Sequence, residues 1–147
     1  MTFSHVNKAL SYITYQGSLL VFRQPDFPDA GLQIPGGTVE LDEPLEAAAL
    51  REAHEETGLA NLKLVAYLGS TEYELKVDVG PPHRRHFFHL AYSGPWQARW
   101  EHFEAAPSLG GPPIRFELWW EPLSSVRLDW EMDALLPLVE AAAVGRR

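Results

Sequence analysis

The sequence has no cysteine, no long apolar run and few cationic side chains. The absence of cysteine excludes disulfide frameworks and thiolate metal sites, and it favours a reducing compartment. The apolar segments are too short or too interrupted to cross a bilayer. The first residues also lack the basic and apolar regions of a signal peptide. We therefore expect a cytoplasmic protein that makes no use of a membrane.

Negative charge exceeds positive charge: 20 acidic residues against 12 Lys and Arg give a formal net charge of −8. Proteins that bind nucleic acid or anionic lipid usually present a basic face, so neither partner is expected. An anionic small-molecule substrate would need bound cations to reverse the local potential.

The length of 147 residues suits one hydrophobic core. No internal repeat, low-complexity tract or linker divides the chain, so residues 1–147 are expected to form a single domain. Proline-rich and glycine-rich loops are predicted at residues 24–31 and 107–113. Alternating apolar patterns predict six strands, at Lys8–Tyr15, Ser18–Arg23, Leu32–Ile34, Lys63–Lys76, His86–Tyr92 and Ile114–Glu121.

Two helices are expected. One runs from about Glu43 to Thr57, with Gly58 as its C-terminal stop. The other runs from an Asp129 cap to about Ala143, with a bend at Pro137. Strands around a central helix, followed by a closing helix, indicate an α/β fold with a mixed sheet.

The segment IPGGTVELDEPLEAAALREAHEETGL, residues 34–59, joins a Pro-Gly-Gly turn to an acid-rich helix. Glu52, Glu55 and Glu56 share one helix face, near the end where the macrodipole disfavours anions. Such repulsion between carboxylates predicts that a bound cation lies among them. Oxygen ligands suit Mg²⁺, with Mn²⁺ as the second choice. The alternative is an ordinary solvated helix face. Against that alternative, Gly37 offers bare backbone to a ligand, and Arg51 is placed to hold a carboxylate.

Gly37, five residues, Glu43, seven residues and then REAHEETGL, residues 51–59, resemble the signature box of Nudix hydrolases. We call residues 37–59 the box; all its fixed Gly, Glu and Arg positions are filled. Ala53, Asp42 and Pro44 depart from the residues often found at their positions. The resemblance implies a Nudix-like α/β/α sandwich with a mixed sheet, and a metal-binding helix that follows the PGG turn.

The resemblance also implies a reaction and a set of roles. Nudix enzymes hydrolyse a nucleoside diphosphate linked to another group, NDP-X, with a divalent metal. Glu52, Glu55 and Glu56 would be metal ligands, with the Gly37 carbonyl as a further one. Arg51 would form a structural pair with Glu43.

The general base is predicted within the box, with Glu55 ahead of Glu52. In this family the base can also lie on a later loop. Glu104 and Glu117 are the alternatives outside the box because both are predicted on or beside loops.

Substrate contacts are predicted for four residues. Arg23 lies where the family often has a substrate-contacting arginine. Arg84 and Arg85 form the densest basic spot away from the C-terminus, although a solubilising hairpin tip explains them equally well. Trp100, in the segment Trp96–Phe103, could stack a nucleobase, with core packing as the alternative. The histidines of His83–His89 alternate faces along a strand, which disfavours a zinc site.

Two other functions stay open at this point. The chain could be a nucleotide-sensing Nudix module without turnover, or a hydrolase of non-nucleotide diphosphates. Subgroup signatures that would select a leaving group are absent, so the substrate class expected is a small-molecule nucleotide diphosphate. Homodimers are common in the family, and an exposed tryptophan patch would support one.

Overall fold

The computed structural model describes residues 5–74, 81–104 and 111–144. Within these residues the chain forms a seven-stranded sheet in the order β4-β5-β1-β2-β7-β6, with β3 paired to β1. Strands β1 and β5 run parallel, whereas the other pairs are antiparallel. The strands are β1 (Val6–Tyr15), β2 (Ser18–Arg23), β3 (Gly36–Thr38), β4 (Leu62–Tyr73), β5 (His83–Tyr92), β6 (Arg99–Glu104) and β7 (Ile114–Pro122).

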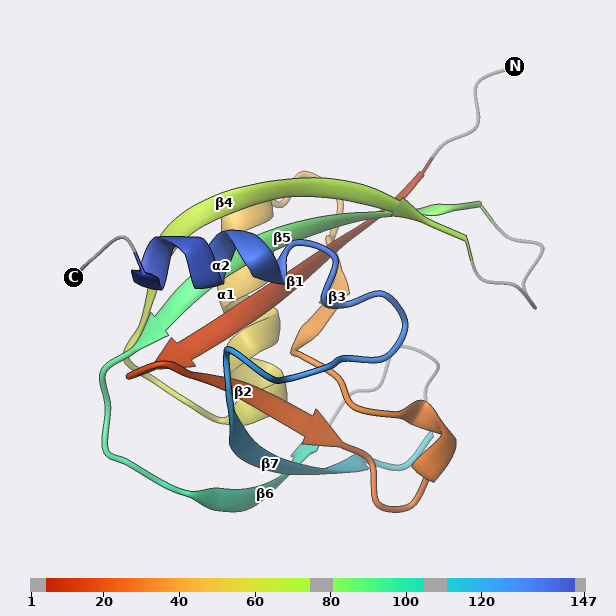
Figure 1. Cartoon of the computed structure of the whole chain (residues 1–147). Helices are drawn as coiled ribbons and strands as arrows, with labels where there is room; N and C mark the ends of the chain where they lie inside the picture. The colour runs from red at the N-terminus through yellow and green to blue at the C-terminus, as the bar shows by residue number, and fades with distance from the viewer. Residues whose placement is uncertain (1–4, 75–80, 105–110, 145–147) are drawn as a thin grey trace.

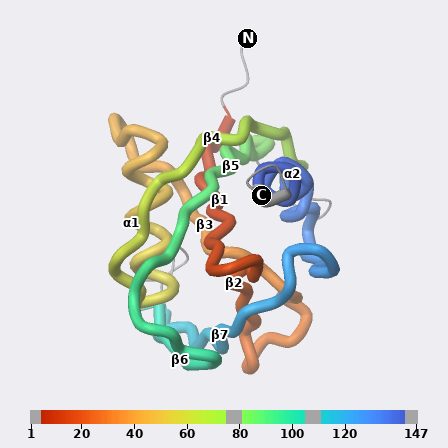
Figure 2. The backbone as a smooth tube through the Cα atoms, turned by 60° about the vertical axis from the view of Figure 1, so that its left-hand side comes forward, coloured from red at the N-terminus to blue at the C-terminus, as the bar shows by residue number. Residues whose placement is uncertain are grey.

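Helix α1 (Leu45–Thr57) covers one face of the sheet and helix α2 (Leu136–Val144) the other, and a short 3₁₀ turn (Pro28–Ala30) follows β2 (Figures 1 and 2). Each face has its own apolar core. Ala48, Ala49 and Ala53 pack in the core under α1, and Leu136 and Val139 pack in the core under α2. The predicted α/β/α sandwich with a mixed sheet is confirmed.

Strands β1 and β2 separate soon after their shared turn, and this fork positions the site. They pair only at Thr14↔Leu19 and Tyr15↔Ser18. Further along, β3 takes the place of β2 beside residues 8–10 of β1. Gln33 joins the diverging β2 through an isolated bridge to Phe22. The fork therefore lies next to Gly36, where β3 begins.

A tight turn of two residues joins β1 to β2. Gln16 and Gly17 both have positive φ, 45° and 82°, as a type I′ turn requires. Gly58 ends α1 in the left-handed conformation, and its N–H donates to the His54 carbonyl at 2.8 Å, as predicted for a C-terminal stop.

Several predicted boundaries are wrong. Helix α1 begins at Leu45, not Glu43, because Pro44 keeps an extended backbone. The strand predicted at Leu32–Ile34 is reduced to the Gln33 bridge, and the strand at this place is β3.

Later in the chain, helix α2 begins at Leu136 instead of after Asp129. Pro137 consequently falls in its first turn, where proline is tolerated, and does not bend its middle. Strand β5 starts at His83, three residues earlier than predicted. Parts of the predicted strand 63–76 and of the loop 107–113 lie outside the described residues.

Candidate active site

Arg51 on α1 connects the loop at the start of the box to the acidic face of the helix. Its Nε and Nη2 donate to the two carboxylate oxygens of Glu43 at 2.8 and 2.9 Å, a bidentate geometry. Nη2 also donates to the Thr38 carbonyl at 3.1 Å, and Nη1 donates to Glu52 at 2.8 Å. The bond to Arg51 lowers the pKa of Glu43 to about 2. Arg51 thus fixes the loop after β3 against the helix that carries the acids.

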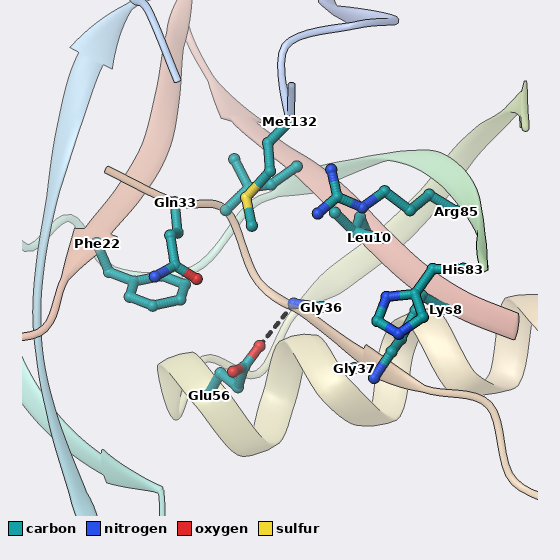
Figure 3. A pocket seen from close by; sticks show the side chains of 11 residues that line it. Lys8, Leu10, Phe22, Gln33, Gly36, Gly37, Glu56, His83, Arg85 and Met132 are labelled. Carbon is teal, nitrogen blue, oxygen red and sulfur yellow. Dashed lines mark hydrogen bonds between the residues drawn. The ribbon is translucent and has the colours of Figure 1, made fainter. Parts of the chain in front are cut away.

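The two glycines of the PGG turn lie against the acidic face of α1. The Gly36 N–H donates to Oε1 of Glu56 at 2.6 Å, the bond drawn in Figure 3. A Cβ atom at Gly37 would lie only 2.3 Å from Cδ of Glu52. Only glycine lets the backbone approach that carboxylate so closely.

Four carboxylates act on one another at this place. Burial raises the pKa of Glu56 well above its usual value, and the charges of Glu104, Glu52 and Glu55 raise it further. Burial is also the main cause that raises the pKa of Glu52 and of Glu104. Glu104 comes from β6, so a second element adds to the acidity of the helix face. Four carboxylates therefore share this place with one guanidinium, that of Arg51, which pairs with Glu52 and Glu55.

The donor chemistry fits a hard divalent cation, because the cluster offers carboxylate oxygens and the backbone of Gly37. In residues 5–74, 81–104 and 111–144, no three acidic or histidine side chains already converge on one point. Glu52 is held by Arg51 and Glu56 by the Gly36 N–H. Glu55 is half exposed and accepts only a long bond of 3.3 Å from Arg51.

A cavity of about 210 Å³ opens at the fork in the sheet, beside Gly36, Gly37 and Glu56. Figure 3 shows Glu56 reaching up to it from α1 and the Arg85 guanidinium turned toward its interior. Apolar and polar side chains share its wall, and these are Lys8, Leu10, Phe22, Gln33, Ile34, His83, Arg85 and Met132.

The structure places only one of the predicted substrate contacts in this cavity. Arg85 lines it and is 7 % exposed, so it is no solubilising hairpin tip. Arg84 points elsewhere and pairs with Glu72 on β4 at 3.0 Å. Trp100 donates its indole N–H to the Thr57 carbonyl at 2.9 Å and packs against the core under α1.

Arg23 and Glu117 lie together on the outer strands β2 and β7. Arg23 pairs with Glu117 at 3.0 Å, and Arg99 also donates to this carboxylate. Arg23 lines a different cavity, beside Trp119. Neither residue belongs to the wall beside Glu56. Of the two alternative bases, Glu104 is therefore the one that the structure brings to the box.

The histidines of His83–His89 have separate surroundings. His86 bonds to Tyr67 and Asn7, whereas His89 bonds to Thr14. In the segment Trp96–Phe103, Trp96 stacks on both Tyr15 and Trp120.

Sequence reasoning missed Lys8, Gln33, His102 and Met132. Lys8, Gln33 and Met132 reach the cavity from β1, from the bridge to β2 and from the turn before α2. His102 on β6 bonds through Nε2 to the Glu55 carbonyl at 2.7 Å, at the C-terminal end of α1. No local motif marks these residues. The parallel pairing of β1 with β5 is the signal that would have placed Lys8 beside Arg85.

Among the described residues, no helix combines the length and the hydropathy that a bilayer crossing requires.

Comparison with known families gives a match to the NUDIX domain over residues 7–138. Comparison with curated proteins gives no significant match. Solved structures with the same fold include a UDP-X diphosphatase, with a TM-score of 0.67 and 16% identity. That match covers 100% of this chain and 66% of the diphosphatase, so the chain spans about two thirds of its length.

Two further structures are similar over nearly their whole length. The Escherichia coli ORF135 protein has a TM-score of 0.64 and 23% identity, and the match covers 98% of this chain and 94% of that protein. An Ap4A hydrolase of C. elegans, in a binary complex, has a TM-score of 0.63 and 19% identity, with 95% and 98% covered. At these identities the likeness establishes the fold.

Proposed function

Because this chain belongs to the NUDIX domain family, we propose that it hydrolyses a nucleoside diphosphate linked to another group, with Mg²⁺ as the first candidate ion and Mn²⁺ as the second. Nudix hydrolases generally need divalent metal ions. The observation that carries the proposal is the acid cluster of Glu52, Glu55, Glu56 and Glu104, which lies beside the glycine pair and a cavity and whose negative charge Arg51 offsets only in part.

The proposed ligands are the carboxylates of Glu52, Glu55 and Glu56, with the Gly37 carbonyl as a fourth. Such a set of hard oxygen donors leaves room for phosphate oxygens of the substrate. When bound, the divalent ion supplies neutralisation of the diphosphate charge and activation of water. Arg51 and Glu43 act as a positioning pair, because their bidentate bond fixes the helix against the loop after β3.

The reaction is the addition of water to one phosphorus, with cleavage of the P–O–P anhydride bond. The products are a nucleoside monophosphate and the phosphorylated partner group. Glu55 is the first candidate for the group that accepts the water proton, since its half-exposed side chain is the least restrained. Glu52 and Glu104 follow, and Glu117 ranks last because two arginines hold it.

The substrate proposed is a small nucleotide diphosphate. The structures named a UDP-X diphosphatase and an Ap4A hydrolase share this fold, which supports a diphosphate-linked nucleotide as the substrate class. Arg85 is the substrate contact that the cavity supports, while Arg23, Arg84 and Trp100 lie outside its wall.

Mass spectrometry tests the proposal directly. The protein is incubated with Mg²⁺, Mn²⁺ or EDTA and a panel of nucleoside triphosphates, sugar nucleotides, ADP-ribose, dinucleoside polyphosphates and coenzyme A. Cleavage is expected for at least one class, with no cleavage in EDTA. Glu56→Gln should abolish it, whereas the exposed Glu72→Gln on β4 should not. Full turnover by Glu56→Gln at saturating Mg²⁺ would refute the ligand assignment. Nucleotide binding without cleavage of any compound would favour a sensing module.

A further inference from the structure

Two cations line the cavity, and they face each other across neighbouring strands. Lys8 on β1 is the register partner of Arg85 on β5, so both side chains lie on the same face of the sheet. Like charges directly opposite each other in a sheet are destabilising. The chain nevertheless keeps two cations at these positions, although its net charge is −8. An acid at either position would have replaced the repulsion by an attraction.

Neither cation has a carboxylate partner among the described residues. Lys8 donates to the Thr38 hydroxyl at 2.6 Å. Arg85 lies over the Tyr73 ring at 3.7 Å and donates to the Trp130 carbonyl. Glu131 acts on Arg85 only through its charge. Glu52 and Glu56 act on Lys8 in the same way. Five other arginines among the described residues pair with acids, namely Arg23, Arg51, Arg84, Arg99 and Arg115. Arg127 instead donates to the Val126 carbonyl.

An unpaired cation that is 7 % exposed is costly, and replacing such a group by an apolar side chain is often neutral or stabilising. Arg85 has five N–H donors, and the contacts above use few of them. Its guanidinium turns toward the interior of the cavity, between Leu10 and Met132 (Figure 3). The Arg85 guanidinium therefore has N–H donors and a positive charge that are available to a ligand in the cavity.

We propose that Lys8 and Arg85 form an oxyanion subsite, which takes a negatively charged group of the substrate separate from the diphosphate at the acidic helix. The inference rests on the proposed function and narrows it: the group X of NDP-X carries a phosphoryl or carboxylate group. The planar guanidinium of Arg85 can donate two parallel hydrogen bonds to the oxygens of a carboxylate or phosphoryl group, and Lys8 supplies a point charge. The small cavity admits that group and not a whole nucleotide, since pockets for drug-sized ligands start at about 300 Å³.

Matched ligand pairs that differ by one oxyanion test the subsite. UDP-glucuronate and UDP-glucose differ by a carboxylate, and ADP-ribose 1″-phosphate and ADP-ribose differ by a phosphoryl group. Calorimetric affinities in EDTA measure binding without turnover. The charged member of at least one pair should bind about 10-fold or more tightly, the size expected for a bond to a charged group. The pair that shows the preference identifies the oxyanion.

Variants of the two cations should remove this preference. Arg85→Met and Lys8→Met are each expected to reduce it to within about three-fold, while Arg85→Lys keeps part of it. Arg84→Met, next in sequence but paired with Glu72 on the surface, is the matched control and should keep it whole. Arg85→Met should also unfold at the same temperature as the wild type or higher.

Three results would overturn the subsite. The first is that the wild type binds the charged and the uncharged member of each pair equally. The second is an unchanged preference in both Lys8→Met and Arg85→Met, and the third is a large loss of stability in Arg85→Met with no effect of Lys8→Met on the preference. The outcome is separable from that of the proposed function. An oxyanion preference in EDTA without hydrolysis in Mg²⁺ would refute the hydrolase alone, and hydrolysis without the preference would refute the subsite alone.

Discussion

Replacing Gly37 with alanine tests the closest approach in the site. The added Cβ would lie 2.3 Å from Cδ of Glu52 and 2.4 and 2.5 Å from its two oxygens. The backbone at Gly37 lies outside the left-handed region, so alanine would suffer no backbone strain there. Any effect of the substitution therefore comes from the collision with a proposed metal ligand.

The size of the effect follows from this distance. Ordinary contact begins at 3.4 Å, so the carboxylate or the strand must move by about 1.1 Å. A displacement of about 1 Å in a catalytic group lowers the rate on the order of 10²-fold. Overpacking costs about 1–3 kcal/mol. We expect Gly37→Ala to lose about 10²-fold in kcat/KM and about 1–3 kcal/mol in the free energy of unfolding.

Steady-state hydrolysis and urea unfolding measure the two quantities. Gly17→Ala is the control: Gly17 has a φ of +82° and no atom within 4 Å of an added Cβ, so it should lose stability but keep kcat/KM. In a Glu52→Ala background the obstructing carboxylate is gone, and the stability cost of Gly37→Ala should disappear. Wild-type kcat/KM in Gly37→Ala, or an equal stability cost in both backgrounds, would refute the reasoning.

Three other predictions concern the acids of the cluster. Glu56→Gln keeps an acceptor for the Gly36 N–H and removes a buried charge, so its thermal unfolding in EDTA should be no lower than that of the wild type. It should lose the stabilisation by Mg²⁺, about 2.7 kcal/mol at 100 times the Kd. Because the pKa values of Glu52, Glu56 and Glu104 are raised, the folded state in EDTA binds more protons, and the urea midpoint should fall from pH 5 to pH 8. Excess Mg²⁺ should abolish this fall, and a midpoint that rises with pH in EDTA would contradict it. Glu55→Gln should lower kcat by about 10²–10⁴-fold and Glu117→Gln should not; a larger loss in Glu104→Gln would move the base to β6.

The sequence predicted those parts of the site that lie close together along the chain. The shared face of the acids and the Gly58 stop follow from helical spacing and local turn chemistry. The resemblance to the Nudix box implied the Arg51 pair with Glu43. The start of the helix was misplaced because Glu43 looks helical by composition. Its carboxylate instead accepts the Glu40 N–H at 3.0 Å and the Arg51 bonds, while Pro44 keeps the backbone extended.

The parts that depend on strand pairing could not be predicted. The sequence pattern predicts no strand at β6, because Trp96, Trp100 and Phe103 recur at helical spacing and mask an alternation of period two. In the structure, Arg99 to Glu104 alternate between exposed and half-buried positions on the sheet edge. That edge brings Glu104 to the box. Lys8 reaches the cavity through a parallel register between strands that lie far apart in sequence.

Acids and a cation both lie beside the glycine pair, and this arrangement gives the metal a second effect. Glu56 accepts the Gly36 N–H, and Glu52 lies against Gly37. Burial lowers the pKa of Lys8, and the charges of Glu52 and Glu56 oppose this shift. The acids therefore weaken the attraction of the cavity for an anion. A divalent cation held by them would weaken this opposition, because it would make the potential across the turn less negative. Metal and anionic substrate should accordingly strengthen each other's binding by the same factor, since such coupling is reciprocal.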